Sequence, residues 1–191
     1  MATKKCPNGH QYDTSIYGDN CPFCIEISHK TSLHILDSYH MSEQSVQHLK
    51  DSEWDSVSKI EYRFLESSIP PQYHRSYTIS ISASSTTISI DCYGKELLKK
   101  KYRNTFFKFL CLKEKLSALD IYKHKEVDSK GCTGGQTEYF RLYKEDYCIF
   151  DGYVYHCKGD CGTLHLPQDV CALICDAIPT GVQSLIESTL K

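Results

Sequence analysis

The first 24 residues concentrate four side chains of the types that bind metals. Cys6-Pro7-Asn8-Gly9-His10 and Cys21-Pro22-Phe23-Cys24 are two short turns separated by a polar loop of ten residues. The proline after each leading cysteine and the glycine before the histidine favour such turns. Three thiolates and one imidazole are the ligands that Zn²⁺ prefers in a closed tetrahedral site. Because the segment has little apolar surface, we expect the metal to supply its folding free energy, about 10–16 kcal/mol in small zinc sites.

The pattern therefore predicts one structural Zn²⁺ ion held by Cys6, His10, Cys21 and Cys24. Four protein ligands fill the tetrahedron, so no position stays open for a water molecule that the metal would activate. The competing interpretation is a redox-active Cys21-x-x-Cys24 pair without metal.

Cysteine content and charge limit the class of protein. The chain has 191 residues, 11 cysteines and a formal net charge of −2, with a pI near 6.5. This balance gives no global field that would attract nucleic acid or an anionic membrane. The basic N-terminus lacks the apolar run of a signal peptide, and no stretch approaches the roughly 18–20 apolar residues of a membrane span. We therefore expect a cytoplasmic protein with reduced thiols and no membrane association.

Composition divides the chain into three parts. Residues 1–26 form the metal segment, residues 27–57 are interpreted as a polar linker with a short helix near Ser42–Lys50, and residues 58–191 form the main domain. The metal segment is too small for a hydrophobic core, whereas the main domain has enough apolar positions for one.

The main domain begins with strand patterns. Polar and apolar residues alternate over Lys59–Leu65, Tyr73–Ser82 and Thr87–Cys92, which predicts a three-stranded antiparallel meander. Thr137–Tyr143 and Tyr147–Tyr155 predict two further strands, rich in aromatic residues and joined by a tight turn.

Helical spacing replaces this alternation elsewhere. Apolar residues recur every three or four positions over Phe106–Leu119. A second helix, opened by Pro167, is apolar nearly all round over Val170–Ile178, so we expect it to be buried, and Thr180 then fits the N-cap of a third. Together the elements predict an α+β fold in which helices pack on one face of an antiparallel sheet.

The N-terminal segment resembles a small zinc ribbon of the C-P-x-G-H-x-Y-D … C-P-x-C type. Here the motif reads Cys6-Pro7-Asn8-Gly9-His10-Gln11-Tyr12-Asp13 and Cys21-Pro22-Phe23-Cys24. Such ribbons occur at the N-terminus of multidomain bacterial proteins, often near signalling components. The resemblance implies a bacterial protein with the same four zinc ligands. From Ser58 onward the chain resembles bacterial domains of unassigned function.

Four later cysteines form two C-x₃-C pairs: Cys157, Cys161, Cys171 and Cys175. Together they are compatible with a second metal site. The second pair also fits the apolar helix as small core side chains, which is a common position for cysteine. The sequence leaves both interpretations open.

Three further features have a functional and a simpler interpretation. The loop Gly131–Gly135 offers main-chain N–H groups to an anion. Cys132 or Cys157 offers a nucleophile if His124 or His156 acts as its base. The simpler interpretation of the loop is a flexible connection between a helix and a strand. The later tyrosines suit stacking on bases or ordinary positions at the edge of a core; they are Tyr139, Tyr143, Tyr147, Tyr153 and Tyr155.

Ten basic residues lie between Lys95 and Lys125, and such a segment can bind phosphate or can simply be solvated. They are Lys95, Lys99, Lys100, Lys101, Arg103, Lys108, Lys113, Lys115, Lys123 and Lys125.

These features predict a non-enzymatic zinc-binding protein. We expect the ribbon to precede a domain that binds another protein or a small ligand. The alternatives are a nucleic-acid-binding protein that uses the ribbon and the Lys95–Lys125 segment, and a thiol-dependent enzyme.

Overall fold

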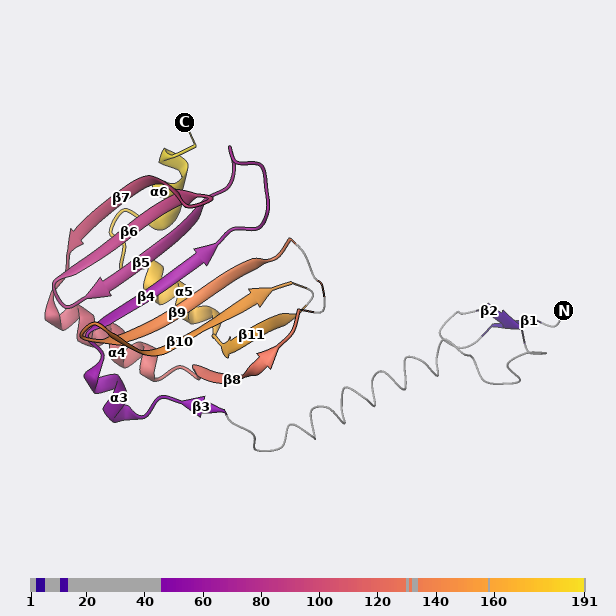
Figure 1. Cartoon of the computed structure of the whole chain (residues 1–191), viewed down its shortest axis with the longest axis horizontal. Coiled ribbons are helices and arrows are strands. Elements are labelled where there is room, and N and C mark those ends of the chain that lie inside the picture. The colour runs from indigo at the N-terminus through magenta and orange to yellow at the C-terminus, as the bar shows by residue number, and fades with distance from the viewer. Residues whose placement is uncertain are drawn as a thin grey trace. The chain divides into compact units, whose positions relative to one another are not determined.

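Nine strands of this chain form one antiparallel sheet (Figure 1). The computed structural model describes the backbone of residues 3–5 and 11–13, and residues 46–129, 131, 134–157 and 159–190 in full. The chain divides into two units, Met1–Gln44 and Ser45–Lys191. In the first unit, β1 (Thr3–Lys5) and β2 (Gln11–Asp13) pair in antiparallel fashion.

The first half of the large sheet is a meander of four consecutive strands. These are β4 (Lys59–Leu65), β5 (Ser76–Ser82), β6 (Ser85–Cys92) and β7 (Lys95–Arg103). The predicted meander is confirmed and is one strand longer than expected. β7 was missed because its lysines obscure the alternation, although lysine is a common residue on exposed edge strands.

The second half of the sheet is joined to the first through β4. Its strands are β8 (Tyr122–Val127), β9 (Gln136–Lys144), β10 (Tyr147–His156), β11 (Asp160–His165) and the short β3 (Gln47–His48). The order across the sheet is β3-β8-β11-β10-β9-β4-β5-β6-β7. β9 and β10 confirm the two predicted aromatic strands, and β9 pairs with β4 with Tyr62 opposite Phe140.

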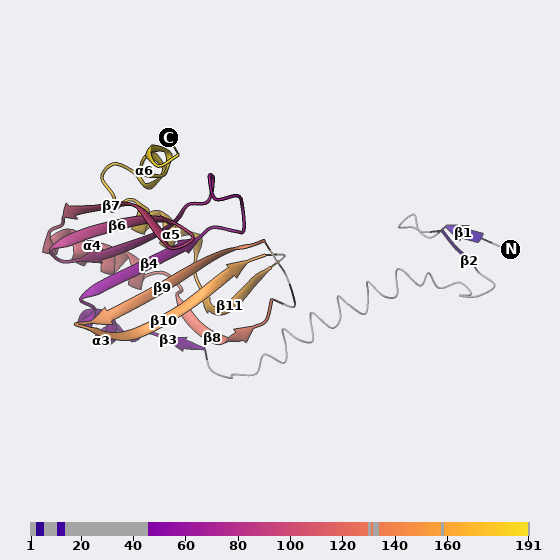
Figure 2. The same ribbon diagram turned by 45° about the horizontal axis from the view of Figure 1, so that its top comes forward.

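Helices cover one face of this sheet. The described residues of the second unit contain the helices α3 (Asp51–Ser56), α4 (Phe106–Ser117), α5 (Gln168–Cys175) and α6 (Val182–Ser188). Figures 1 and 2 show α4 and α5 behind the sheet, and none of the described helices of this unit lies on the opposite face. The coarse prediction of a mixed α+β fold with a large antiparallel sheet is confirmed.

The core lies between the sheet and these helices. Strand alternation directs Ile60, Tyr62, Ile79 and Ile88 to the helix side, where all four are fully buried. The other side of β5 and β6 carries short polar residues such as Thr78, which faces Ser89 across the β5–β6 pair. This opposite side is called the open face below.

The polypeptide before β4 also contributes to the core. Residues 27–57 were interpreted as a linker, but α3 places Trp54 in the core, and Val57 is buried just after it. Of the helix expected at Ser42–Lys50, the described part contains β3 instead.

The two C-terminal helices differ in detail from the prediction. α5 buries only Val170 and Ile174, so one side of it packs inward rather than nearly all of it. Thr180 does not cap α6; the N-cap is Gly181, with φ of 72°. The Thr180 hydroxyl is hydrogen-bonded to the Tyr102 hydroxyl at 2.7 Å, which explains why it does not cap the helix.

Candidate functional site

The predicted zinc ligands Cys6, His10, Cys21 and Cys24 all lie outside the described residues, so the zinc site remains a prediction. The described backbone nearby is the β1–β2 pair, in which Lys5 lies opposite Gln11. These two residues directly precede Cys6 and follow His10 in the sequence, so the strand pairing holds together the two ends of the first predicted turn.

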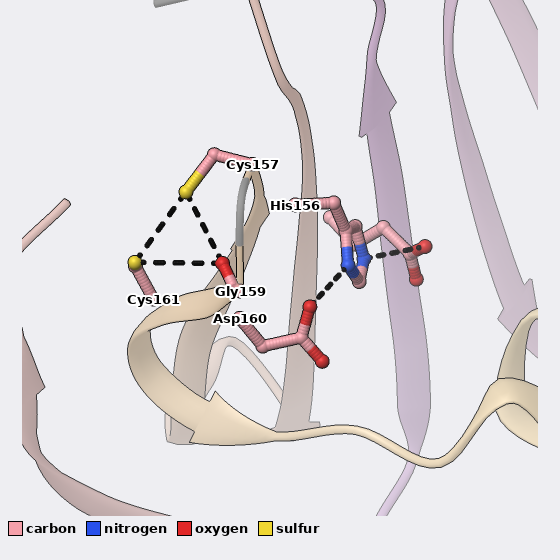
Figure 3. A network of polar contacts seen from close by, with 6 residues as sticks. His156, Cys157, Gly159, Asp160 and Cys161 are labelled. Atoms are coloured by element: carbon pink, nitrogen blue, oxygen red, sulfur yellow. Dashed lines mark hydrogen bonds and ion pairs between the residues drawn. The ribbon is translucent and has the colours of Figure 1, made fainter. Parts of the chain in front are cut away.

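The first later cysteine pair lies at the turn between β10 and β11. The Sγ atoms of Cys157 and Cys161 are 3.5 Å apart, and both thiols donate to the carbonyl oxygen of Gly159, at 3.1 and 3.6 Å (Figure 3). Tyr155 lies opposite Cys161 in the β10–β11 register. Residue alternation places both side chains on the open face.

His156 points to the other side of the same turn, away from the two thiols (Figure 3). Its Nδ1 lies 2.8 Å from an Asp160 oxygen and its Nε2 lies 3.1 Å from a Glu138 oxygen. Burial alone would lower the pKa of His156, but the hydrogen bonds and charges of these two carboxylates outweigh burial and raise it. Both ring nitrogens donate only in the protonated form, so this arrangement favours the imidazolium.

The second cysteine pair lies on α5, under the sheet. The Sγ atoms of Cys171 and Cys175 are 3.9 Å apart, and the Tyr77 hydroxyl is 3.9 Å from the Cys175 sulfur. Hydrogen bonding from Cys175 lowers the pKa of the Cys171 thiol against the opposing effect of burial. The neighbouring Tyr62 hydroxyl is buried without a hydrogen-bond partner among the described groups, and burial raises its pKa.

The structure therefore separates the two C-x₃-C pairs. Cys157 and Cys161 face the open side of the sheet. Cys171 and Cys175 pack at the edge of the core on the helix-covered side, which agrees with their interpretation as small core side chains. Within the described residues, no group of three or more His, Cys, Asp or Glu side chains is placed to hold a metal ion. The four cysteines do not converge on a second zinc site.

The described residues do not assemble a thiol–imidazole pair for catalysis. Cys132 lies outside them. His124 contacts the Lys125 carbonyl oxygen at 2.8 Å, and both ring nitrogens of His156 contact carboxylates. The nearby Gly135 donates its N–H to the Tyr155 hydroxyl at 3.1 Å, and a Cβ there would lie 2.2 Å from the His156 carbonyl oxygen, so only glycine fits.

The basic segment does not form one continuous patch. Its residues on β7 and β8 are separated by six strands of the sheet. Lys113 is buried, and its Nζ donates to the carbonyl oxygens of Asp55 and Val57 at 2.9 and 3.2 Å, so it holds α4 against the segment before β4. Lys123 forms an ion pair with Asp151 at 3.0 Å.

The later tyrosines lie mostly on the open face and already have partners. Tyr139 and Tyr153 contact each other with ring centroids 5.8 Å apart, and the Tyr153 hydroxyl donates to Glu126 at 2.5 Å. The Lys59 ammonium lies 3.7 Å from the ring centre of Tyr143. Stacking on bases would compete with these contacts.

An exposed apolar patch at the start of α4 was not predicted from the sequence. Phe109 and Leu116 point into the core as expected, but Phe106, Phe107 and Leu110 are 65%, 75% and 40% exposed. We call these three residues the α4 patch. A groove of about 230 Å³ adjoins Phe107, and Ile81, Leu112 and Leu173 line it. Two aromatic residues in succession were the signal for this patch, since one helix face cannot bury both.

A second hollow, of about 540 Å³, lies beside the Cys175 thiol. Phe64, Tyr77, Cys175 and Ile186 are among its walls. Arg75 closes one side, where its Nε and one terminal nitrogen donate to the side-chain and main-chain oxygens of Thr189, each at 2.7 Å. These bonds hold the end of α6 against the sheet.

Comparison with known proteins gives no relative of this chain. No family model, no curated protein and no solved structure matches it. Among the described residues, no helix is long and apolar enough to cross a membrane.

Proposed function

We propose that this chain is a non-enzymatic zinc protein of the bacterial cytoplasm whose sheet domain binds another protein. The partner presents an apolar helical segment flanked by carboxylates, which docks on the α4 patch and its groove. The observation that carries the proposal is the pair of adjacent phenylalanines, 65% and 75% exposed, on a helix that is otherwise anchored in the core.

The helix supports this role because it is held firmly. The Thr105 hydroxyl accepts a hydrogen bond from the Lys108 N–H at 3.3 Å and caps the N-terminus of α4. Phe109 and Leu116 anchor the helix in the core. The exposed side chains are thus presented on a rigid element, and large apolar residues that a folded domain leaves in water are typical of interaction surfaces.

Charge around the groove favours an acidic partner. Lys108 and Lys115 line the groove, and Asp176 is the one acidic residue among its described lining. Carboxylates on both sides of an apolar segment would meet these lysines at the rim, where charge adds specificity and association rate more than affinity.

A small ligand in the larger hollow is less well supported. Its charged groups already bond within the chain: Arg75 to Thr189, and Glu66 to the Gln136 amide at 3.0 Å. A ligand would have to replace these bonds, whereas the α4 patch is covered by nothing within the described residues.

The zinc motif contributes a second, rigid element ahead of this domain. We propose that Cys6, His10, Cys21 and Cys24 bind one structural Zn²⁺. The donor types fit the metal, and the pairing of β1 with β2 sets the residues that flank Cys6 and His10 opposite each other. The ion would fix the fold of the segment and take no part in chemistry.

Peptide display against the full zinc-loaded chain tests the docking proposal. We expect selected peptides to share an apolar helical stripe with flanking Asp or Glu. Their affinity should fall by at least about tenfold for Phe106→Ser/Phe107→Ser, since the patch would supply the central contacts. Tyr147→Ser is the matched control, because Tyr147 is a 76% exposed aromatic residue on a different turn. Equal binding by the double variant, or enrichment of basic peptides, would rule the proposal out.

Nucleic-acid binding is the second candidate function, and its support comes from the lysines of β7 and α4. Its signature is retention on heparin that disappears at moderate salt, with weaker retention for a variant in which Lys99, Lys100 and Lys101 are glutamine. Absence of retention at low salt would exclude it.

A further inference from the structure

The turn between β10 and β11 carries a cysteine pair that the proposed function does not use. Cys157 and Cys161 are both partly exposed, their sulfur atoms lie 3.5 Å apart, and both thiols converge on the Gly159 carbonyl oxygen (Figure 3). Two side chains that already point at one atom need little further rotation to meet. A disulfide requires the sulfur atoms to approach to about 2.05 Å.

We propose that Cys157 and Cys161 form a reversible disulfide by exchange with small-molecule disulfides such as glutathione disulfide. The site is therefore a thiol-modification site on the open face of the sheet. It is independent of the docking role of α4.

The exchange balances in two steps. The thiolate of one cysteine attacks a sulfur of the small disulfide; the old S–S bond breaks, one small thiol leaves and a mixed disulfide forms. The second cysteine loses its proton and attacks the protein sulfur of that mixed disulfide, which releases the second small thiol. The protein loses two electrons and two protons, and the small disulfide gains them.

The turn geometry favours closure here over closure at Cys171 and Cys175. Side chains four residues apart on a helix have Cβ atoms about 5–6 Å apart, whereas a disulfide needs about 3.5–4.5 Å. α5 would have to distort before its pair could bond. Cys157 and Cys161 instead flank the connection between two strands, with Gly159 between them, so no helix has to distort for their sulfur atoms to meet. Equal spacing in the sequence thus gives one pair that can close and one that stays reduced.

The neighbouring His156 does not need to act in the exchange. It lies on the opposite side of the turn, between Asp160 and Glu138 (Figure 3). Its variants should leave the yield of disulfide unchanged, which separates a proximity effect from base catalysis.

Peptide mapping tests the proposal directly. Zinc-loaded full-length protein is equilibrated with glutathione and glutathione disulfide at several ratios, trapped with an alkylating agent and digested with trypsin. Cleavage after Lys158 puts Cys157 in peptide 145–158 and Cys161 in peptide 159–191. The disulfide therefore appears as these two peptides joined, with the loss of two hydrogen atoms, and a thiol reductant should separate them.

Single variants assign the bond. Cys157→Ser and Cys161→Ser should each abolish the joined peptides and accumulate glutathione on the remaining cysteine. Cys148→Ser and the double variant Cys171→Ser/Cys175→Ser should keep them, although these residues lie in the same two peptides. We expect alkylation of Cys157 and Cys161 to fall by at least about tenfold at the most oxidising ratio.

Three results would overturn the proposal. The joined peptides never form in the folded protein at any ratio; they persist in Cys157→Ser, which would assign the bond to Cys148; or the protein binds a second zinc ion that protects both thiols from alkylation. The last result would make the pair a metal site.

Discussion

The two units of this chain differ in the residues that could stabilise them. Residues 1–26 contain two isoleucines and no leucine or valine, but four predicted metal ligands. The unit Ser45–Lys191 buries 22 hydrophobic residues between a nine-stranded sheet and its helices. We propose that the first segment depends on a metal for its stability whereas the domain depends on its core, so each should respond to a different perturbation.

The largest expected effect is the loss of zinc from the N-terminal motif. Cys21→Ser removes one thiolate ligand and with it most of the about 10–16 kcal/mol that a small structural site gains from its metal. We expect the variant to lose its zinc, measured by elemental analysis, while the sheet domain keeps its urea midpoint. Cys148→Ser is the control, since Cys148 lies on β10, and should retain zinc. Retention of stoichiometric zinc by Cys21→Ser would contradict the metal dependence proposed for the N-terminal segment.

A cavity in the sheet domain should lower the stability of this domain and leave the N-terminal segment unaffected. Phe140 is fully buried and contacts the Phe150 ring edge-on, with centroids 6.4 Å apart. Phe140→Ala should reduce the free energy of unfolding by about 3–5 kcal/mol. Zinc content should not change. Phe107→Ala, on the exposed α4 patch, should stay within about 0.5 kcal/mol of the parent in the same urea titration. Similar losses for the two variants would contradict the burial described for them.

An intermediate effect is expected at the buried ammonium of Lys113. Lys113→Met keeps the length of the side chain but leaves the carbonyl oxygens of Asp55 and Val57 without this donor. We expect a loss of about 1–3 kcal/mol, the cost of stranding buried acceptors. Lys115→Met on the exposed side of α4 is the control and should be nearly neutral in urea unfolding. A neutral Lys113→Met would mean that water reaches these oxygens.

The smallest effect is a pH dependence confined to the sheet domain. The pKa of His156 is raised in the folded state, so its contribution to stability is fully present below its unfolded pKa of about 6.5 and is lost as the pH rises through the folded value. His156→Gln should therefore cost more stability at about pH 5.5 than at about pH 8.5. The urea midpoints at the two values measure this, and an equal cost at both would contradict the paired imidazolium.

Strand alternation explains how much of the fold was accessible from the sequence. β4, β5, β6 and β9 bury alternate residues and β10 buries two residues of one face, and their patterns predict them correctly. β7, β8 and β3 were missed because edge and near-edge strands bury few side chains on either face, so no apolar period marks them. The core role of Trp54 was hidden in a polar segment for the same reason: only one residue of α3 is buried.

The functional features were less accessible because they depend on which face a residue reaches. Equal C-x₃-C spacing suggested that Cys157, Cys161, Cys171 and Cys175 form one series, but the chain passes from β11 to α5 between the pairs and so changes faces. The Lys95–Lys125 segment looked continuous in sequence, yet Lys113 turns inward and the sheet separates its two ends. Sequence spacing alone does not show which face of the sheet a side chain reaches.

Hydrogen exchange of the zinc-loaded full chain, with and without a chelator, tests the two sources of stability most directly. We predict that the chelator removes protection from peptides that contain β1 and β2 and leaves protection in β4, β9 and β10 unchanged. Unchanged protection in β1 and β2 after complete removal of the metal would contradict the account.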